Sequence, residues 1–206
     1  MGRTKIGAVV MLSALALAAC GSSTTTSEKQ PTKPHATEVT VFAPTADDGS
    51  STVKPTKVLD GSCWTTSIGS SRQDGYRCSA GHEIYDPCFV VDPGKPQTRV
   101  LCMNSPFDRD AVELKIPDLP EADASDVGGT PEDGNPWALV LESGQRCEST
   151  GGGATSAVNG QRLNYVCGKD LALYGEPDRT TATWTIYGRH GDETQLKRVP
   201  IAHAYF

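Results

Sequence analysis

Short runs of apolar and β-branched residues, separated by Gly, Pro, Asn and Asp, make up most of the chain after residue 58. Runs of this kind are typical of strands, and no window of about ten residues there has a helical period. The clearest runs are Trp137–Leu141, Arg162–Val166, Thr183–Tyr187 and Val199–Tyr205. The pattern predicts a mainly β domain over residues 58–206, an antiparallel sandwich or partly open barrel of about eight strands.

Two turn sequences predict hairpins within this domain. Asp92–Pro96 separates the apolar runs Phe89–Val91 and Arg99–Leu101, and its Pro and Gly residues favour a turn. Gly188–Asp192 supplies a turn for the last hairpin of the chain. Asp86-Pro87 is interpreted as a further turn, after a strand that contains Ile84 and Tyr85.

The start of the chain has the pattern of a cleaved export signal. Arg3 and Lys5 precede the apolar run Ile6–Ala19, which is too short to span a bilayer of about 30 Å as a helix. Leu17-Ala18-Ala19-Cys20 resembles the lipobox of bacterial lipoproteins, which implies cleavage before Cys20 and a diacylglycerol on its thiol. We therefore expect residues 1–19 to be removed. Acyl chains on Cys20 would then hold the protein on the outer face of the bacterial cytoplasmic membrane.

Residues 20–57 are dominated by Ser, Thr and Pro and have too little apolar material for a core. We expect a disordered stalk between the anchor and the domain. Its one apolar stretch is Val39–Phe42. We interpret this stretch as chance clustering; the alternatives are an edge strand docked on the domain and a partner-binding segment.

The charge of the chain argues against nucleic acid as a partner. The formal net charge is −6, and loss of Arg3 and Lys5 with the signal leaves 17 basic against 25 acidic side chains. Phosphate binding needs a basic surface. The expected partners are the membrane, through the lipid anchor, and an envelope protein or polymer; no cofactor is expected.

Six cysteines remain after Cys20, an even number that predicts three disulfides in an exported protein. Two stretches of the chain also resemble each other. Val58–Cys63 is similar to Val140–Cys147, and Tyr76–Cys78 is similar to Tyr165–Cys167. Ile84–Pro87 likewise has a counterpart in Leu173–Pro177. Either the domain has two similar halves, 58–117 and 136–206, or the echo is coincidental in a β-rich chain.

If the halves are real, each has its own disulfide, Cys63–Cys78 in the first and Cys147–Cys167 in the second. Cys88 and Cys102 then remain, and they flank the hairpin around Asp92–Pro96. No metal site is expected, because a C-x₂-C spacing is absent from the sequence and oxidised cysteines are not zinc ligands. His82, in a predicted loop, is interpreted as a bystander.

The segment 118–135 is rich in Asp and Glu and has no basic residue. We interpret it as a solvated acidic linker between the halves. A calcium loop is the alternative, but Glu121–Asp126 lacks the glycine at the sixth position and the distal Glu of that motif.

The string of Gly61-Ser62-Cys63-Trp64, Tyr76-Arg77-Cys78 and Asp86-Pro87-Cys88-Phe89 resembles a cysteine-rich extracellular module of actinobacterial secreted proteins and lipoproteins. Pro136–Leu139 and Tyr165–Cys167 are similar to later parts of the same module. The resemblance covers about residues 58–206 and implies an extracellular location and a disulfide architecture. It implies no activity and no functional residues.

No catalytic motif is present: the sequence lacks G-x-S-x-G, H-E-x-x-H and G-x-x-x-x-G-K. Gly151–Gly153 lacks the lysine of a phosphate loop and predicts a hairpin tip. At least two of Trp64, Trp137 and Trp184 are expected in the core. We therefore predict a lipoprotein with a non-enzymatic binding or structural role. The alternative is an envelope hydrolase that uses dispersed carboxylates or histidines, for example near His190 and Asp192.

Overall fold

The computed structural model describes residues 35–46, 50–91, 99–120, 134–151 and 155–206. The predicted signal, Cys20, the first part of the stalk, the turn Asp92–Pro96 and most of the acidic linker lie outside these ranges. Within them, no helix is long and apolar enough to cross a membrane. The described residues belong to one compact unit.

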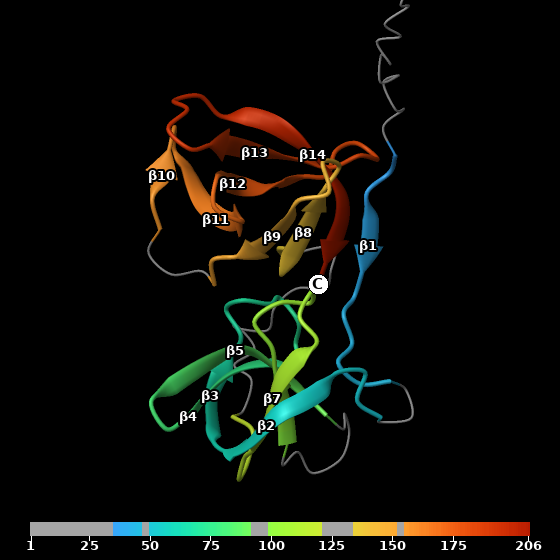
Figure 1. Ribbon diagram of the computed structural model, residues 1–206, viewed down its shortest axis with the longest axis vertical. Coiled ribbons are helices and arrows are strands. Elements are labelled where there is room, and N and C mark those ends of the chain that lie inside the picture. Colours follow the sequence, from blue (N-terminus) through green and yellow to red (C-terminus); the bar gives the residue numbers. More distant parts are fainter. Residues whose placement is uncertain (1–34, 47–49, 92–98, 121–133, 152–154) are drawn as a thin grey trace, which may run out of the picture. The chain divides into compact units, whose positions relative to one another are not determined.

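The first half of the domain is a six-stranded sheet (Figure 1). Its strands, in chain order, are β2 (Lys54–Asp60), β3 (Ser62–Thr66), β4 (Gly75–Ala80), β5 (Glu83–Val90), β6 (Arg99–Cys102) and β7 (Asp110–Lys115). The spatial order is β2-β7-β6-β5-β4-β3. Only β2 and β7 pair in parallel.

The two edge strands of this sheet, β2 and β3, are consecutive in the chain and separated only by Gly61. The Gly61 N–H donates to the Lys115 carbonyl on β7, 2.9 Å away. A side chain at this position would collide with the Ser79 carbonyl on β4. The chain therefore passes from one edge strand of the sheet to the other at Gly61, where the absence of a Cβ avoids this collision.

The second half is a closed ring of six strands (Figure 1). Its strands are β8 (Ala138–Leu141), β9 (Arg146–Ser149), β11 (Gln161–Cys167), β12 (Leu171–Asp178), β13 (Thr185–His190) and β14 (Lys197–Tyr205). The order is β8-β14-β13-β12-β11-β9, and β8 pairs with β9 to close the ring. Two short strands add to it, β1 (Glu38–Thr40) beside β14 and β10 (Ala157–Val158) beside β11.

The predicted mainly β class, with three disulfides, is confirmed. The two halves also share one strand order: β2, β7, β6, β5, β4 and β3 of the first correspond to β8, β14, β13, β12, β11 and β9 of the second. The number of strands was underestimated, because the described residues contain fourteen. Two of the extra strands, β1 and β10, have only three and two residues.

Each disulfide joins neighbouring strands. The pairs are Cys63–Cys78, Cys88–Cys102 and Cys147–Cys167, the same three that the sequence predicted. Cys63 lies directly opposite Cys78 in the ladder, and Cys88 lies opposite Cys102. The side chains of five of the six are buried in the apolar clusters of their own half.

The folded unit begins before residue 58, so the predicted boundary of the stalk is wrong. Residues Glu38–Thr40 pair in parallel with His203–Tyr205 of β14. The Phe42 N–H donates to the Phe206 carbonyl and the Phe206 N–H to the Thr40 carbonyl, at 2.8 and 2.9 Å. Val39–Phe42 is therefore docked on the domain, with Val39 and Thr40 in an edge strand, and the interpretation as chance clustering is wrong. Its apolar residues and β14 satisfy each other's backbone groups, which composition alone does not reveal.

Phe42 also packs into a cluster shared by both halves. Its ring centroid lies 5.5 Å from that of Trp137 and 6.2 Å from that of Phe89. The Phe89 and Trp137 rings are themselves 5.5 Å apart, edge to face. Phe89 belongs to β5 of the first half and Trp137 precedes β8 of the second, so three aromatic rings form the core where the halves meet.

Two predicted turns are strand residues. Asp86 and Pro87 lie within β5, where together they face Arg77 of β4 in a bulge, a position at which a sheet accepts proline. Gly188, Arg189 and His190 pair with β12, and the turn after them starts at Gly191. Of the three tryptophans, Trp137 is buried and Trp184 packs against the second core, as expected for two of them, whereas Trp64 is exposed.

Candidate binding groove

A polar groove of about 830 Å³ lies between the β3–β4 loop of the first half and the outer surface of the second. This size is within the usual range for small-ligand sites. All but four of its lining residues have polar side chains; the exceptions are Ile68, Gly69, Pro136 and Gly175. The polar residues are Ser67, Ser70, Ser71, Asn135, Ser149, Thr150, Gln161, Arg162, Asn164, Tyr165, Glu176, Asp178, Tyr187 and Arg198.

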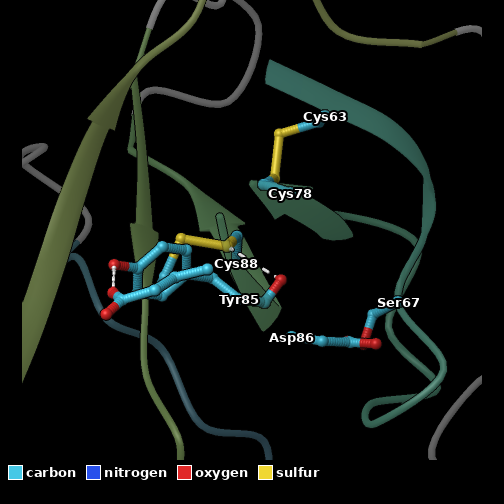
Figure 2. Close-up of a disulfide and its surroundings, with 8 residues drawn as sticks. Cys63, Ser67, Cys78, Tyr85, Asp86 and Cys88 are labelled. Carbon is cyan, nitrogen blue, oxygen red and sulfur yellow. Dashed lines mark hydrogen bonds between the residues drawn. A yellow bond between two sulfur atoms is a disulfide. The ribbon is translucent and has the colours of Figure 1, made fainter. Parts of the chain in front are cut away.

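Asp86 shapes the rim of the groove formed by Ser67–Ser71. Its carboxylate accepts hydrogen bonds from the Ser67 hydroxyl and from the N–H groups of Ile68 and Gly69, the last two at 3.3 Å. Figure 2 shows Ser67 and Asp86 pointing toward each other. The bulge at Asp86-Pro87 in β5 thus turns a carboxylate toward the loop, and the loop is held by side-chain bonds instead of strand pairing.

Burial raises the pKa of Asp86 above its ordinary value, while the hydrogen bonds from Ser67, Ile68 and Gly69 and the charge of Arg77 oppose this rise. The Arg77 Nε lies 3.8 Å from an Asp86 carboxylate oxygen. Three of these donors belong to the β3–β4 loop, so the partly buried carboxylate holds the conformation of that loop. Ser67 in turn holds the next residues of the loop, because its hydroxyl oxygen accepts hydrogen bonds from the Gly69 and Ser70 N–H groups at 3.1 and 2.9 Å.

The opposite wall comes from β11 and β12. The buried Tyr165 hydroxyl donates to the Pro136 carbonyl at 2.8 Å, and burial raises the pKa of Tyr165, so the phenol stays protonated. The Asn164 amide donates to the Gly175 carbonyl at 2.9 Å. The first bond connects β11 to the segment that enters β8, and the second connects β11 to β12.

The charged side chains of the groove have polar or charged neighbours. Arg198 lies 3.5 Å from the Asp178 carboxylate, and its guanidinium carbon stands 3.9 Å from the centroid of the Tyr187 ring. Hydrogen bonds from Thr180, and then the charge of Arg198, lower the pKa of Asp178, which is therefore ionised at neutral pH. Glu176 accepts a hydrogen bond from the Asn135 amide at 3.3 Å.

Gly175 leaves room for the Gln161 side chain. It has φ of +72°, a conformation that favours glycine, and a Cβ there would collide with the Gln161 amide oxygen. Within the described part of the chain, neither the Gln161 amide nor the Tyr187 hydroxyl makes a hydrogen bond to another residue. Both groups line the groove, so both can bond to a ligand.

None of the described histidines lines the groove. His82 is exposed in a turn, as expected, and His190 and Asp192 lie at the exposed end of the β13–β14 hairpin. His203 stacks on Tyr205 at 4.2 Å, and its Nε2 lies 2.8 Å from the Thr40 hydroxyl. The structure thus separates His190 and Asp192 from the groove. Among the described residues, no group of three or more His, Cys, Asp or Glu could hold a metal ion.

The groove was missed at the level of sequence, for a physical reason. Its residues come from both halves and are polar, so no periodicity or motif connects them. The available signal was the β3–β4 segment Ser67–Ser71, whose three serines and one glycine are typical of a loop held by side-chain hydrogen bonds.

The chain matches no protein-family model, no curated protein and no solved structure. The resemblance of the GSCW, YRC and DPCF strings to an actinobacterial module therefore stays a prediction.

Proposed function

We propose that the chain is a lipid-anchored protein of the outer face of the bacterial cytoplasmic membrane, and that it binds a polar envelope component in the groove without catalysis. The observation that carries the proposal is the groove itself, with fourteen polar side chains around about 830 Å³. The three disulfides support an oxidising compartment, and the Leu-Ala-Ala-Cys20 sequence supports the anchor.

The fixed geometry of the groove also supports a binding role. Asp86 holds one rim through three hydrogen bonds, and Tyr165 and Asn164 fix the other wall. A ligand that meets a preorganised site loses less entropy than one that must order it.

A hydrolase is the second candidate, because two carboxylates, Glu176 and Asp178, line the same groove. Glycosidases use two carboxyl groups, one of which must hold a proton at working pH. The pKa of Asp178 is lowered, so in such a pair Glu176 would have to be the proton donor. The Asn135 amide already donates to the Glu176 carboxylate at 3.3 Å, and binding without turnover is therefore the function that we favour.

The test is capture from a bacterial envelope extract by the chain lacking residues 1–20, with its disulfides formed. Ser71→Trp places a large side chain in the groove, and Ser143→Trp, on an exposed turn outside the groove, is the matched control. We expect the wild type and Ser143→Trp to retain the same component and Ser71→Trp to lose it. Equal retention by all three would contradict the proposal. Conversion of the retained material, abolished by Glu176→Gln, would support the hydrolase.

A further inference from the structure

We infer that the ligand of the groove is an uncharged oligosaccharide; this inference rests on the proposed binding function and specifies its ligand. A saccharide of a few rings fits a groove of about 830 Å³. Its hydroxyls both donate and accept hydrogen bonds, which suits a lining rich in serine, threonine and amide side chains.

The charges of the groove favour an uncharged ligand. Two arginines and two acidic residues line it, so the formal charges balance. Arg198 is already next to Asp178 and stacked on Tyr187, and the Arg162 Nε donates to the Thr155 hydroxyl at 3.1 Å. A strongly anionic ligand, such as a phosphorylated glycan, would lack the excess of basic groups that phosphate recognition uses.

The groups ready for a ligand are uncharged as well. The Gln161 amide offers donors and an acceptor, and the Tyr187 hydroxyl offers one of each. Ile68, with 49% of its surface exposed, and Pro136 add a small apolar area against which the C–H face of a sugar ring can pack. Planar polar groups beside a small apolar surface are suited to a sugar ring, which has hydroxyls at its edge and C–H bonds on its faces.

A peptide fits this surface less well. Extended peptides bind to sheets by adding a strand at a free edge. The strands of the groove lack such an edge along most of their length, because β11 pairs with β9, β10 and β12, and β12 pairs with β11 and β13. A lipid chain is disfavoured by the polar lining.

The experiment uses three pools prepared from the envelope extract: neutral oligosaccharides, acidic oligosaccharides and peptides. Each is added to the ¹⁵N-labelled chain lacking residues 1–20, and amide shifts of the groove residues are followed. We expect the neutral pool alone to shift them, and Ser71→Trp but not Ser143→Trp to remove the effect. Gln161→Ala should weaken the apparent affinity about tenfold, the cost of one lost hydrogen bond to a ligand group that stays buried.

The outcomes separate the two proposals. Groove shifts caused by the acidic or the peptide pool, with none from the neutral pool, would overturn the saccharide inference and leave the binding function standing. If no pool shifts the amide signals of the groove residues but capture still depends on Ser71, the saccharide inference is overturned and the binding function still stands. The absence of any dependence on Ser71 in both experiments would overturn both proposals.

Discussion

The two halves of the domain have the same strand order, but their first strands, β2 and β8, run in opposite directions relative to the strands that follow. In the first half β2 continues through Gly61 into β3, so β2 runs parallel to β7. In the second half β8 reverses into β9 through a turn in which the Gly144 N–H donates to the Leu141 carbonyl, so β8 runs antiparallel to β14. The other five strands of each half keep the same relative directions.

This difference shows which features of the shared plan are essential. The first strand of each half, β2 or β8, can run in either direction relative to its neighbour, because parallel and antiparallel pairing both satisfy its backbone groups. The disulfide between the corresponding strand pairs β3–β4 and β9–β11, Cys63–Cys78 or Cys147–Cys167, is common to both halves. The similarity noticed in the sequence around these cysteines therefore has a counterpart in the strand order.

The largest expected effect comes from the disulfides. Replacing Cys147 and Cys167 with alanine should lower the free energy of unfolding by about 2 to 5 kcal/mol, because the second half has no other bridge. Replacing Cys63 and Cys78 should cost less, since Cys63 is only partly buried and Cys88–Cys102 remains. Urea unfolding followed by near-UV circular dichroism measures both. Equal losses of unfolding free energy would show that the second half depends on its bridge no more than the first half does.

The shared aromatic cluster is the next largest contribution. Phe42→Ala should cost about 3 kcal/mol, because it removes a ring packed against Phe89 and Trp137. Val41→Ala is the matched control: its side chain is half exposed, and the expected cost is below about 0.5 kcal/mol. Both can be measured by urea unfolding monitored through tryptophan fluorescence. If both substitutions had the same small effect, residues 35–42 would not belong to the folded unit.

A smaller and more local effect is expected from Asp86 in the bulge of β5, which holds a loop of the first half only. Asp86→Ala should cost about 1.5 kcal/mol and speed hydrogen exchange at Ile68 and Gly69, whose N–H groups lose their acceptor. Asp86→Asn keeps one acceptor oxygen and loses the buried charge, so its effect should be smaller. Exchange at the Asn164 and Gly175 amides of the second half should not change. Faster exchange there would mean that Asp86 stabilises both walls of the groove.

The smallest expected effect concerns the corresponding tyrosines Tyr165 and Tyr76. Tyr165→Phe should cost about 1 kcal/mol, because the Pro136 carbonyl loses its donor. For Tyr76 no hydroxyl hydrogen bond is present within the described ranges, so Tyr76→Phe should cost less. Thermal unfolding of the two variants at neutral pH compares them.

The same tyrosine predicts a pH dependence. Burial raises the pKa of Tyr165 above its ordinary value of 10.0, so the unfolded chain releases this proton at lower pH than the folded one. The stability contribution of the protonated phenol is therefore fully present below pH 10.0 and falls as the pH rises beyond it. Tyr165→Phe should flatten the alkaline loss of stability; an unchanged slope would assign that loss to other groups.

Much of the fold could be predicted from the sequence, because local signals agreed with the final packing. The alternation of Arg162–Val166 predicted a strand, and the even number of cysteines, together with the similarity between the two halves, predicted the bridges. The errors arose where long-range contacts overrode local composition. Val39–Phe42 lies in a Ser/Thr/Pro-rich segment but pairs with the end of the chain, more than 160 residues away. Asp86-Pro87 reads as a turn, yet a bulge accommodates it within a strand.

The groove was not predictable in this way. Ser71 and Asn135 meet through a 3.3 Å hydrogen bond, and Asn135 in turn reaches Glu176, so the rim depends on residues from three distant segments. Each of these side chains is ordinary for an exposed loop or strand end. Only the docking of the halves, driven by Phe42, Phe89 and Trp137, turns them into one surface.

The docked segment around β1 also determines how the domain responds to mechanical force. The chain enters the fold through β1, and all three disulfides lie later in the sequence. A pull on the chain before residue 35 is therefore borne first by hydrogen bonds such as those from Thr37 to Ala182 and from Phe42 to Phe206, which unlike a disulfide can break and re-form. Detachment of the segment before β2 would free a connection that is roughly 60 Å long at full extension, and the covalently bridged strands would stay intact. Under force, this segment would therefore detach and re-dock reversibly before the disulfide-bridged strands unfold.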